Sequence, residues 1–182
     1  MAEPPAPRVV VTVGTDHHPF DRLVGWVDRW AARHPDVEVL LQRGTTAVSL
    51  ASRNVRAVDM LAYDHLVGAM AGADAVVAQG GPGGILDARS VGHRPIVVAR
   101  RHDLGEHVDD HQVRFAAWMS ERGSIDVASD EAALAARLDA VLAHPATQRV
   151  APDAGAGAAA VERFRAIVDP LVAVHRARRR GH

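Results

Sequence analysis

Short segments rich in β-branched residues alternate with segments of helical periodicity along most of the chain. The expected strands span residues 8–13, 36–42, 55–60, 74–78, 95–99 and 124–127. The expected helices span residues 19–33, 63–72, 83–91, 109–122 and 130–142. Strands that alternate with helices pair side by side in the same direction. The alternation therefore predicts an α/β fold, a Rossmann-like parallel sheet with helices on both faces.

The composition limits the size of the protein and its chemistry. With 182 residues, 48% of them apolar, the chain suffices for one domain with a proper core but not for two full α/β domains. The formal charge of −1 gives no electrostatic reason to expect a nucleic-acid partner. The chain has no cysteine, which excludes a disulfide framework and a cysteine-based metal site.

The two ends of the chain differ from the middle. Residues 1–7 lack the charged and apolar regions of a secretory signal, and we expect a short disordered leader. A ligand-binding domain is expected over residues 8–145. Residues 146–182 should form a loop, an amphipathic helix and a basic tail, and Pro170 would either kink that helix or begin a new one. No apolar run approaches the roughly 20 residues that a spanning helix needs, so we expect a protein that is soluble by itself and meets a membrane only peripherally or through a partner.

Three loops should meet at one edge of the predicted sheet. They follow the first, fourth and fifth strands and span residues 14–18, 79–84 and 100–110. Ligands of open parallel sheets bind beyond the carboxyl ends of the strands. All three loops are rich in glycine or polar residues, as a shared ligand cleft would be.

The second of these loops reads Gln-Gly-Gly-Pro-Gly-Gly over residues 79–84. It fits neither the dinucleotide fingerprint G-x-G-x-x-G nor a P-loop, and a dinucleotide-dependent oxidoreductase is therefore disfavoured. A glycine loop that opens a helix offers free N–H groups and a positive dipole end to a phosphate. From the residues alone, a phosphate cradle and a plain turn are equally good interpretations.

The first and third loops carry the remaining candidate residues. Thr15, after Gly14, either binds a phosphate oxygen or caps a helix. The third loop continues into the next helix, and its ionisable residues include Glu106, His107, Asp110 and His111. These four could bind a metal in principle, but they lack the helical spacing of two histidines and an acid, so we predict no metal site. Asp, His and Gln side chains suit carbohydrate hydroxyls, because together they donate and accept.

Taken together, the motifs resemble a known family. The segments that carry the resemblance are Val11-Thr-Val-Gly-Thr15, Pro19-Phe-Asp-Arg-Leu-Val24, Tyr63-Asp64, Gly80-Gly-Pro-Gly83, Pro95-Ile-Val-Val98 and Gly105-Glu-His-Val-Asp-Asp-His-Gln112. They resemble the glycosyltransferase family 28 C-terminal domain, and within it the single-domain PssE/EpsE-like subunits of polysaccharide synthesis. Those are similar to the nucleotide-sugar-binding subunit of the two-subunit N-acetylglucosamine transferase of dolichol-linked glycan assembly.

The resemblance implies the C-terminal half of a GT-B fold and a UDP-sugar donor. The implied diphosphate contacts are Gly14, Thr15, Gly80, Gly81, Gly83 and Gly84. The ribose would be held by Asp87, six residues after Gly81, where the family usually has Glu. The implied sugar contacts are Asp110, His111 and Gln112. Gln79 and Gly84 depart from the family, which often has His and a hydroxyl residue at these positions.

The resemblance also implies a reaction, without a metal or another cofactor. It is inverting transfer of a hexosyl or N-acetylhexosaminyl group to a lipid-linked or polysaccharide acceptor. Glu106 and His18 are the candidate catalytic residues. A membrane-anchored partner subunit would supply the acceptor half and hold the protein at the inner face of the plasma membrane. The C-terminal helix would dock on that partner or pack on its own sheet. The alternative is a non-catalytic nucleotide-sugar-binding or regulatory subunit.

Overall fold

The computed structural model describes residues 8–152. Its elements are, in chain order, β1 (Arg8–Thr12), α1 (Asp21–Ala32), β2 (Glu38–Gln42), β3 (Val55–Val58), α2 (Tyr63–Ala71), β4 (Ala75–Gln79), α3 (Pro82–Ser90), β5 (Ile96–Val98), the 3-10 helix η1 (His102–Leu104), α4 (His111–Glu121), β6 (Asp126–Val127), α5 (Glu131–Ala143) and the 3-10 helix η2 (Pro145–Gln148). Every expected strand and helix between residues 8 and 145 is present. The predicted leader over residues 1–7 and the predicted C-terminal amphipathic helix lie outside the described residues.

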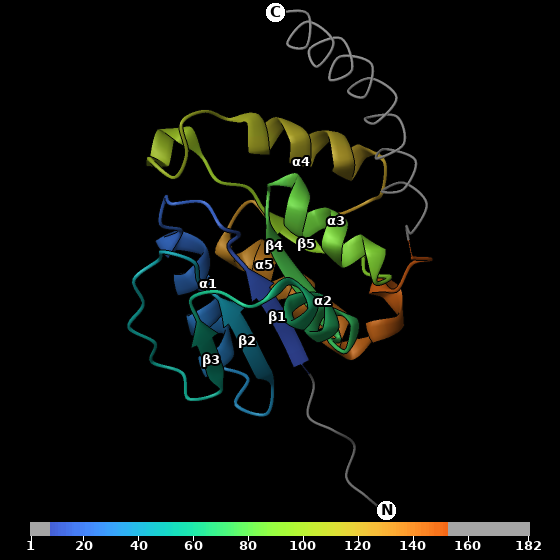
Figure 1. Ribbon diagram of the computed structural model, residues 1–182. Coiled ribbons are helices and arrows are strands. Elements are labelled where there is room, and N and C mark those ends of the chain that lie inside the picture. Colours follow the sequence, from blue (N-terminus) through green and yellow to red (C-terminus); the bar gives the residue numbers. More distant parts are fainter. Residues whose placement is uncertain (1–7, 153–182) are drawn as a thin grey trace, which may run out of the picture. The chain divides into compact units, whose positions relative to one another are not determined.

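All six strands are parallel and follow the order β3-β2-β1-β4-β5-β6 (Figure 1). The chain moves outward from β1 to β3, then returns to the other side of β1 with β4. Thr12, the last residue of β1, therefore pairs with Gln42 of β2 and with Ala78 of β4. The point between β1 and β4 is where the strand order reverses, and ligands of open α/β sheets bind there.

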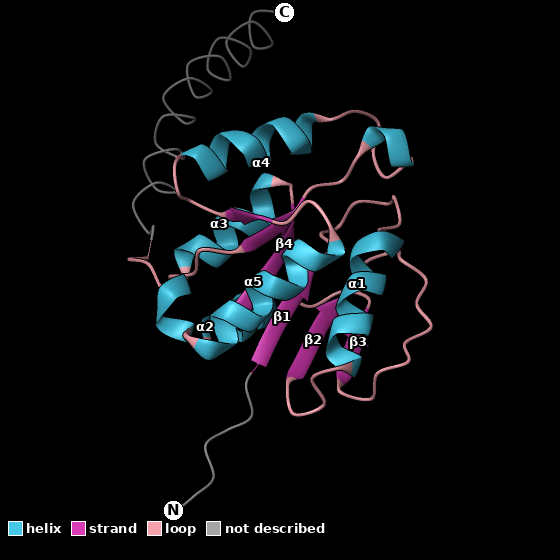
Figure 2. Ribbon diagram, turned by 180° about the vertical axis from the view of Figure 1, so that it is seen from behind, coloured by secondary structure: helices cyan, strands magenta, loops and turns pink. Residues whose placement is uncertain are grey.

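Two layers of helices cover the sheet because successive strand residues point to opposite faces. Val9, Val11 and the alternate residues of the neighbouring strands pack against α1 and α5, which lie in the foreground of Figure 2. Val10 packs with residues of α2 and α3, and Val97 packs with α4. This arrangement confirms the predicted α/β fold with helices on both faces.

The amino end of α4 differs from the prediction. The helix begins at His111 rather than at residue 109, and neither aspartate before it lies in its first turn. Asp109 accepts a hydrogen bond from the His111 N–H at 2.8 Å, and Asp110 accepts one from the His102 N–H at 3.0 Å. Aspartates that bond nearby backbone groups compete with helix formation, and the two carboxylates hold the loop instead.

The described domain also runs past its predicted end at residue 145. Arg149 forms an antiparallel bridge with His93, and the Val150 N–H donates to the Gly92 carbonyl at 2.9 Å. Gln148 is buried and donates to Asp126 of β6 at 2.8 Å. Residues up to 150 therefore belong to the domain. Within residues 8–152, no helix is long and apolar enough to cross a membrane.

Candidate functional site

The loops after β1, β4 and β5 meet at the carboxyl edge of the sheet, as predicted. The Gln79 side chain lies against Gly14 of the first loop, where a Cβ would approach its Nε2 atom to 2.7 Å. On the other side, a Cβ at Gly80 would lie 3.0 Å from the Ala99 Cα and 3.0 Å from the Gln112 Cβ. Gly14 has a φ of +79°, which other residues rarely adopt. These glycines let the three loops pack closely.

The glycine loop opens α3 without a side-chain cap. Gly81 occupies the N-cap position, no side chain accepts from the first turn, and Pro82 begins the helix. Gly83 is exposed, and a Cβ there would meet no atom within 4 Å. A Cβ at Gly84 would instead lie 3.3 Å from the Thr12 methyl group. The open side of the helix terminus therefore lies at Gly83, where backbone N–H groups and the helix dipole would attract an anion.

Thr15 does not cap α1, which removes one of its two sequence interpretations. The helix begins at Asp21, and the Phe20 N–H before it donates to the Thr46 hydroxyl at 2.9 Å. Thr15 is exposed in the loop after β1. Its hydroxyl thus remains a candidate for a phosphate contact.

Asp87 lies on α3 and is paired with a residue of α2. The Tyr63 hydroxyl donates to its Oδ1 atom at 3.2 Å. Burial raises the pKa of the Asp87 carboxyl, and the hydrogen bond from Tyr63 opposes that rise. The Tyr63 side chain is exposed and extends the surface beside the carboxylate.

Arg100 fastens the first loop to the third. Its side chain is fully buried, and its guanidinium donates to the carbonyls of His18 at 2.9 Å, Pro19 at 3.0 Å and Val13 at 3.1 Å. It also lies 4.5 Å from the centre of the Phe20 ring. Burial lowers the pKa of Arg100, but an arginine stays charged in proteins. This buried cation fixes where the loop after β1 lies relative to the end of β5.

Glu106 is held by a second arginine. Arg22 of α1 donates its Nε to Glu106 Oε1 at 2.8 Å and its Nη2 to Oε2 at 2.7 Å. The Arg101 N–H donates to the same Oε2 at 3.0 Å. Both carboxylate oxygens are thus engaged, and the side chain is only 9% exposed. The geometry gives Glu106 an anchoring part and suits a general base poorly, since a base needs an oxygen within reach of the substrate.

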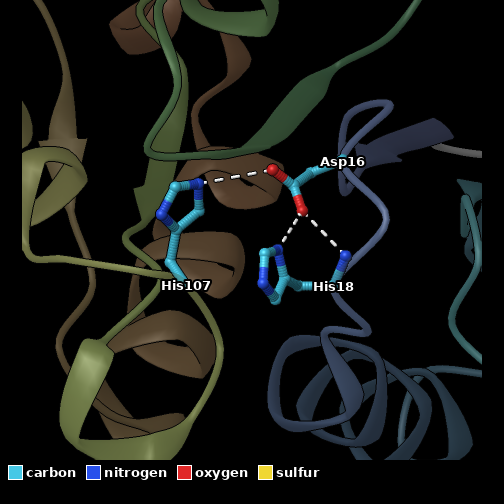
Figure 3. Close-up of side chains that lie close together, drawn as sticks. All are labelled: Asp16, His18 and His107. Carbon is cyan, nitrogen blue, oxygen red and sulfur yellow. Dashed lines mark hydrogen bonds and ion pairs between the residues drawn. The ribbon is translucent and has the colours of Figure 1, made fainter.

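Asp16 of the first loop joins two histidines (Figure 3). Its Oδ1 atom accepts from the His18 N–H at 2.7 Å and lies 2.5 Å from His18 Nδ1, while its Oδ2 atom lies 3.3 Å from His107 Nε2. Burial alone would raise the pKa of Asp16. The hydrogen bonds from His18 and the charges of His18 and Arg100 outweigh it and lower the pKa to about 2. Asp16 is therefore ionised at neutral pH.

The three predicted sugar contacts have different surroundings. His111 is 45% exposed, and its Nδ1 atom lies 2.5 Å from Asp109. Asp110 is exposed and accepts from the His102 N–H. Gln112 is buried, and its Oε1 atom accepts from the Arg100 N–H at 3.2 Å. Asp110 and His111 are therefore exposed at the surface, whereas the buried Gln112 holds the loop after β5 through its hydrogen bond with Arg100.

A hollow of about 440 Å³ lies at this edge of the sheet. It is lined by Arg22, Ala99, Arg101, Asp103, Asp110, Val113, Val127, Ala128 and Ser129. A larger hollow of about 560 Å³ lies at the opposite edge, where β1, β2 and β3 begin. Since ligands of such sheets bind at the carboxyl ends of the strands, the smaller hollow is the one that adjoins the candidate site.

Sequence reasoning missed the side chains that hold the three loops together. Asp16, Arg22 and Arg100 were not candidates, and His107 was considered only with its neighbours along the chain. One signal was available for Arg100, because an arginine directly after an apolar strand has to find buried acceptors. Nothing local to Arg22 or Asp16 identifies partners so distant in sequence.

The sequence model of a protein family, the glycosyltransferase family 28 C-terminal domain, matches residues 8–169 of this chain. No curated protein matches the chain.

Solved structures of similar fold cover most of this chain. The glycotransferase of kitacinnamycin is 20% identical with a TM-score of 0.58, and the match covers 80% of this chain and 38% of that one. MurG of Acinetobacter baumannii is 15% identical with a TM-score of 0.55, covering 81% and 44%. The UDP-GlcNAc 2-epimerase of Neisseria meningitidis, bound to UDP-GlcNAc, is 11% identical with a TM-score of 0.57, covering 92% and 45%. The chain spans less than half of each of these proteins and shares their fold.

Proposed function

The chain belongs to the glycosyltransferase family 28 C-terminal domain family, and from this premise we propose that it binds a UDP-sugar and takes part in glycosyl transfer. One observation carries the proposal. The amino end of α3, which no side chain caps, lies where the strand order of the sheet reverses, beside the loop of Gly14 and Thr15. A helix terminus of this kind binds phosphate through its N–H groups and its dipole.

The donor would lie along α3. Its diphosphate would contact Gly14, Thr15, Gly80, Gly81, Gly83 and Gly84. Asp87, further along the same helix, would bind the ribose through Oδ2, because Oδ1 already accepts from Tyr63. The sugar would reach Asp110 and His111, with Gln112 holding their loop in place.

The transfer would be inverting and independent of metal. An acceptor hydroxyl would attack the anomeric carbon, and the bond from that carbon to the diphosphate oxygen would break. The α3 terminus would stabilise the negative charge that develops on the leaving UDP. His18 would take the proton on Nε2, since Asp16 orients the ring through Nδ1. Asp16 thus supports the role predicted for His18.

A membrane-anchored partner would supply the half that binds the acceptor, and the acceptor would be lipid-linked or a growing polysaccharide. The support is the resemblance of the chain's motifs to the single-domain subunits that act with such a partner. This partner would hold the chain at the inner face of the plasma membrane. A non-catalytic nucleotide-sugar-binding subunit is the second candidate function, and it is favoured by the ion pair that engages Glu106.

Thermal unfolding with UDP tests the donor site. UDP at millimolar concentration should raise the melting temperature, and Asp87→Ala should abolish the rise. Glu121→Ala removes an exposed acid at the far end of α4 and should leave the rise intact. The absence of any shift with UDP, TDP or GDP would refute the donor site.

Reconstitution with a co-expressed membrane partner then tests catalysis. Sugar transfer to the acceptor is measured with the wild-type chain, with His18→Ala and with Glu106→Gln. If UDP binds and neither substitution slows transfer, the chain is a binding subunit and its partner does the chemistry.

A further inference from the structure

We propose that Asp16, His18 and His107 form a binding site for a divalent transition-metal ion of the zinc type. One oxygen of Asp16 and one ring nitrogen of each histidine lie within 4.8 Å of one another. Figure 3 shows both imidazoles turned toward the same carboxylate. The three side chains come from two loops that follow different strands, so the sheet topology assembles them.

The spacing of these atoms fits a small ion. In a tetrahedral zinc site with bonds of about 2.0–2.1 Å, neighbouring ligand atoms lie roughly 3.3 Å apart. Asp16 Oδ2 lies 3.3 Å from His107 Nε2, and Asp16 Oδ1 lies 2.5 Å from His18 Nδ1. These two distances start from different oxygens of Asp16, so a small rotation of the carboxylate and an opening of the shorter pair would bring one oxygen and both ring nitrogens around the ion. The three ligand atoms already lie within 4.8 Å of one another. The fourth position would be left to water or another ligand, as in zinc sites with three protein ligands.

The ligand chemistry selects the class of metal. Imidazole nitrogen suits zinc, copper, nickel and iron, whereas magnesium and calcium prefer oxygen ligands. Asp16 adds a carboxylate oxygen 3.3 Å from His107 Nε2, and zinc sites accept such an oxygen beside imidazole nitrogens.

The surroundings hold the ligands in position. Arg100 anchors the loop of Asp16 and His18 through the carbonyls of Val13, His18 and Pro19. The side chains of His107, His18 and Asp16 are 11%, 22% and 26% exposed. His107 Nδ1 is buried without a hydrogen-bond partner among residues 8–152. The other ring nitrogen, Nε2, is the one that faces Asp16 and would bind the ion.

A second group shares His107 and is the weaker candidate. It consists of His107, Asp109 and His111. Asp109 is 55% and His111 is 45% exposed, and the two already bond each other. More water surrounds this group, so its ligands are less firmly held. The proposal therefore commits to the group that contains Asp16.

The ion and a catalytic His18 would exclude each other, a consequence that rests on the proposed function. A neutral imidazole that binds a metal through one nitrogen carries its hydrogen on the other and has no lone pair left for a proton. Metal binding would thus stop transfer without being required for it. Binding itself is independent of the donor site and can be measured without UDP.

Calorimetric titration of the untagged full chain with Zn²⁺ tests the site. We expect one ion per chain, and Co²⁺ should give the visible absorption bands of a tetrahedral site. Asp16→Asn, His18→Gln and His107→Gln should each weaken binding by at least about tenfold, since even residues that only orient ligands cost 10–100-fold. Circular dichroism and thermal unfolding of each variant show whether it is folded.

Two control variants make the test specific. His65→Gln changes an exposed histidine on α2, and His111→Gln removes the second group. Neither should change the affinity for Zn²⁺. Weak binding of several ions would overturn the proposal, and so would a loss of Zn²⁺ affinity in His65→Gln as large as in the ligand variants. The proposal would also fail if His111→Gln lost affinity for Zn²⁺ while His18→Gln kept it. A chain that binds UDP but no Zn²⁺ would refute the metal site alone.

Discussion

Replacing Glu106 with glutamine separates an anchoring role from a catalytic one. The substitution keeps the size of the side chain and removes its charge. Glu106 accepts two hydrogen bonds from Arg22 and one from the Arg101 N–H. In the variant, the amide oxygen can still accept a hydrogen bond. The amide NH₂ would face a donor of the Arg22 guanidinium or the Arg101 N–H, and two donors form no hydrogen bond.

The expected loss of stability is large because the pair is buried. The side chains of Arg22 and Glu106 are 17% and 9% exposed. Removing one partner of a buried ion pair costs about 3–5 kcal/mol, since the other charge stays behind without compensation. The remaining amide oxygen places Glu106→Gln at the lower end, about 3 kcal/mol. For a domain of this size, this lowers the melting temperature by about 6–12 °C.

Urea unfolding of a double-mutant cycle measures the effect. The cycle combines Glu106→Gln with Arg22→Gln, and we expect a coupling of about 2 kcal/mol between two residues in contact. Arg29 and Glu131 form a matched control, because they make a similar two-pronged pair that is much more exposed. Glu131→Gln should therefore cost far less stability.

One result would refute the anchoring role. If Glu106→Gln unfolds like the wild type and shows no coupling to Arg22→Gln, the ion pair does not hold the loop. If the same variant also abolishes sugar transfer in the reconstituted system, Glu106 is the general base. His18 would then lose its place in the mechanism.

Four further substitutions test α3 and the loops around it. Asp87→Asn should abolish the rise in melting temperature that UDP causes. Without UDP, the variant should melt at a higher temperature than the wild type, and the difference should be larger at neutral pH than in acid. Burial raises the folded pKa of Asp87, so its ionised form costs stability once the pH exceeds the unfolded pKa. Gly83→Ala should keep or slightly raise stability, because alanine favours a helix and its methyl group meets no protein atom, and it should weaken UDP binding. Gly14→Ala should instead lose about 1–3 kcal/mol in urea unfolding, since its backbone has a positive φ. Arg100→Met should lower the free energy of unfolding by at least about 3 kcal/mol, because buried carbonyls lose their hydrogen-bond donor. Urea unfolding would measure this loss.

The sequence predicted the fold and the meeting of three loops at one edge of the sheet, because both depend on local patterns. Apolar strands and amphipathic helices can be recognised within short windows. Once their alternation predicts a parallel sheet, all the loops that follow strands lie at one edge. The meeting of residues 14–18, 79–84 and 100–110 therefore needed no knowledge of side chains.

The chemistry inside the site could not be predicted in this way. Arg22 and Glu106 are far apart in sequence, and only the packing of α1 beside the end of β5 brings them together. The same holds for Asp16 and His107. A list of the residues in one loop therefore proposed Glu106 for catalysis and did not consider Asp16 as a partner of His107. Ion pairs and ligand sets of this kind depend on tertiary structure.

The glycine loop shows how packing and binding share one motif. Gly80 is needed where the chain passes Ala99, and Gly81 is needed because a Cβ would lie 2.5 Å from Gln79 Nε2. Packing thus explains Gly80 fully and Gly81 in part, since the end of the Gln79 side chain could move aside. Gly83 differs, because nothing in the described chain occupies the space where its side chain would be. If the loop were only a turn, alanine at Gly83 would be harmless to every function of the protein. The case for a phosphate cradle thus narrows to one position, and the comparison of Gly83→Ala with Gly14→Ala decides it.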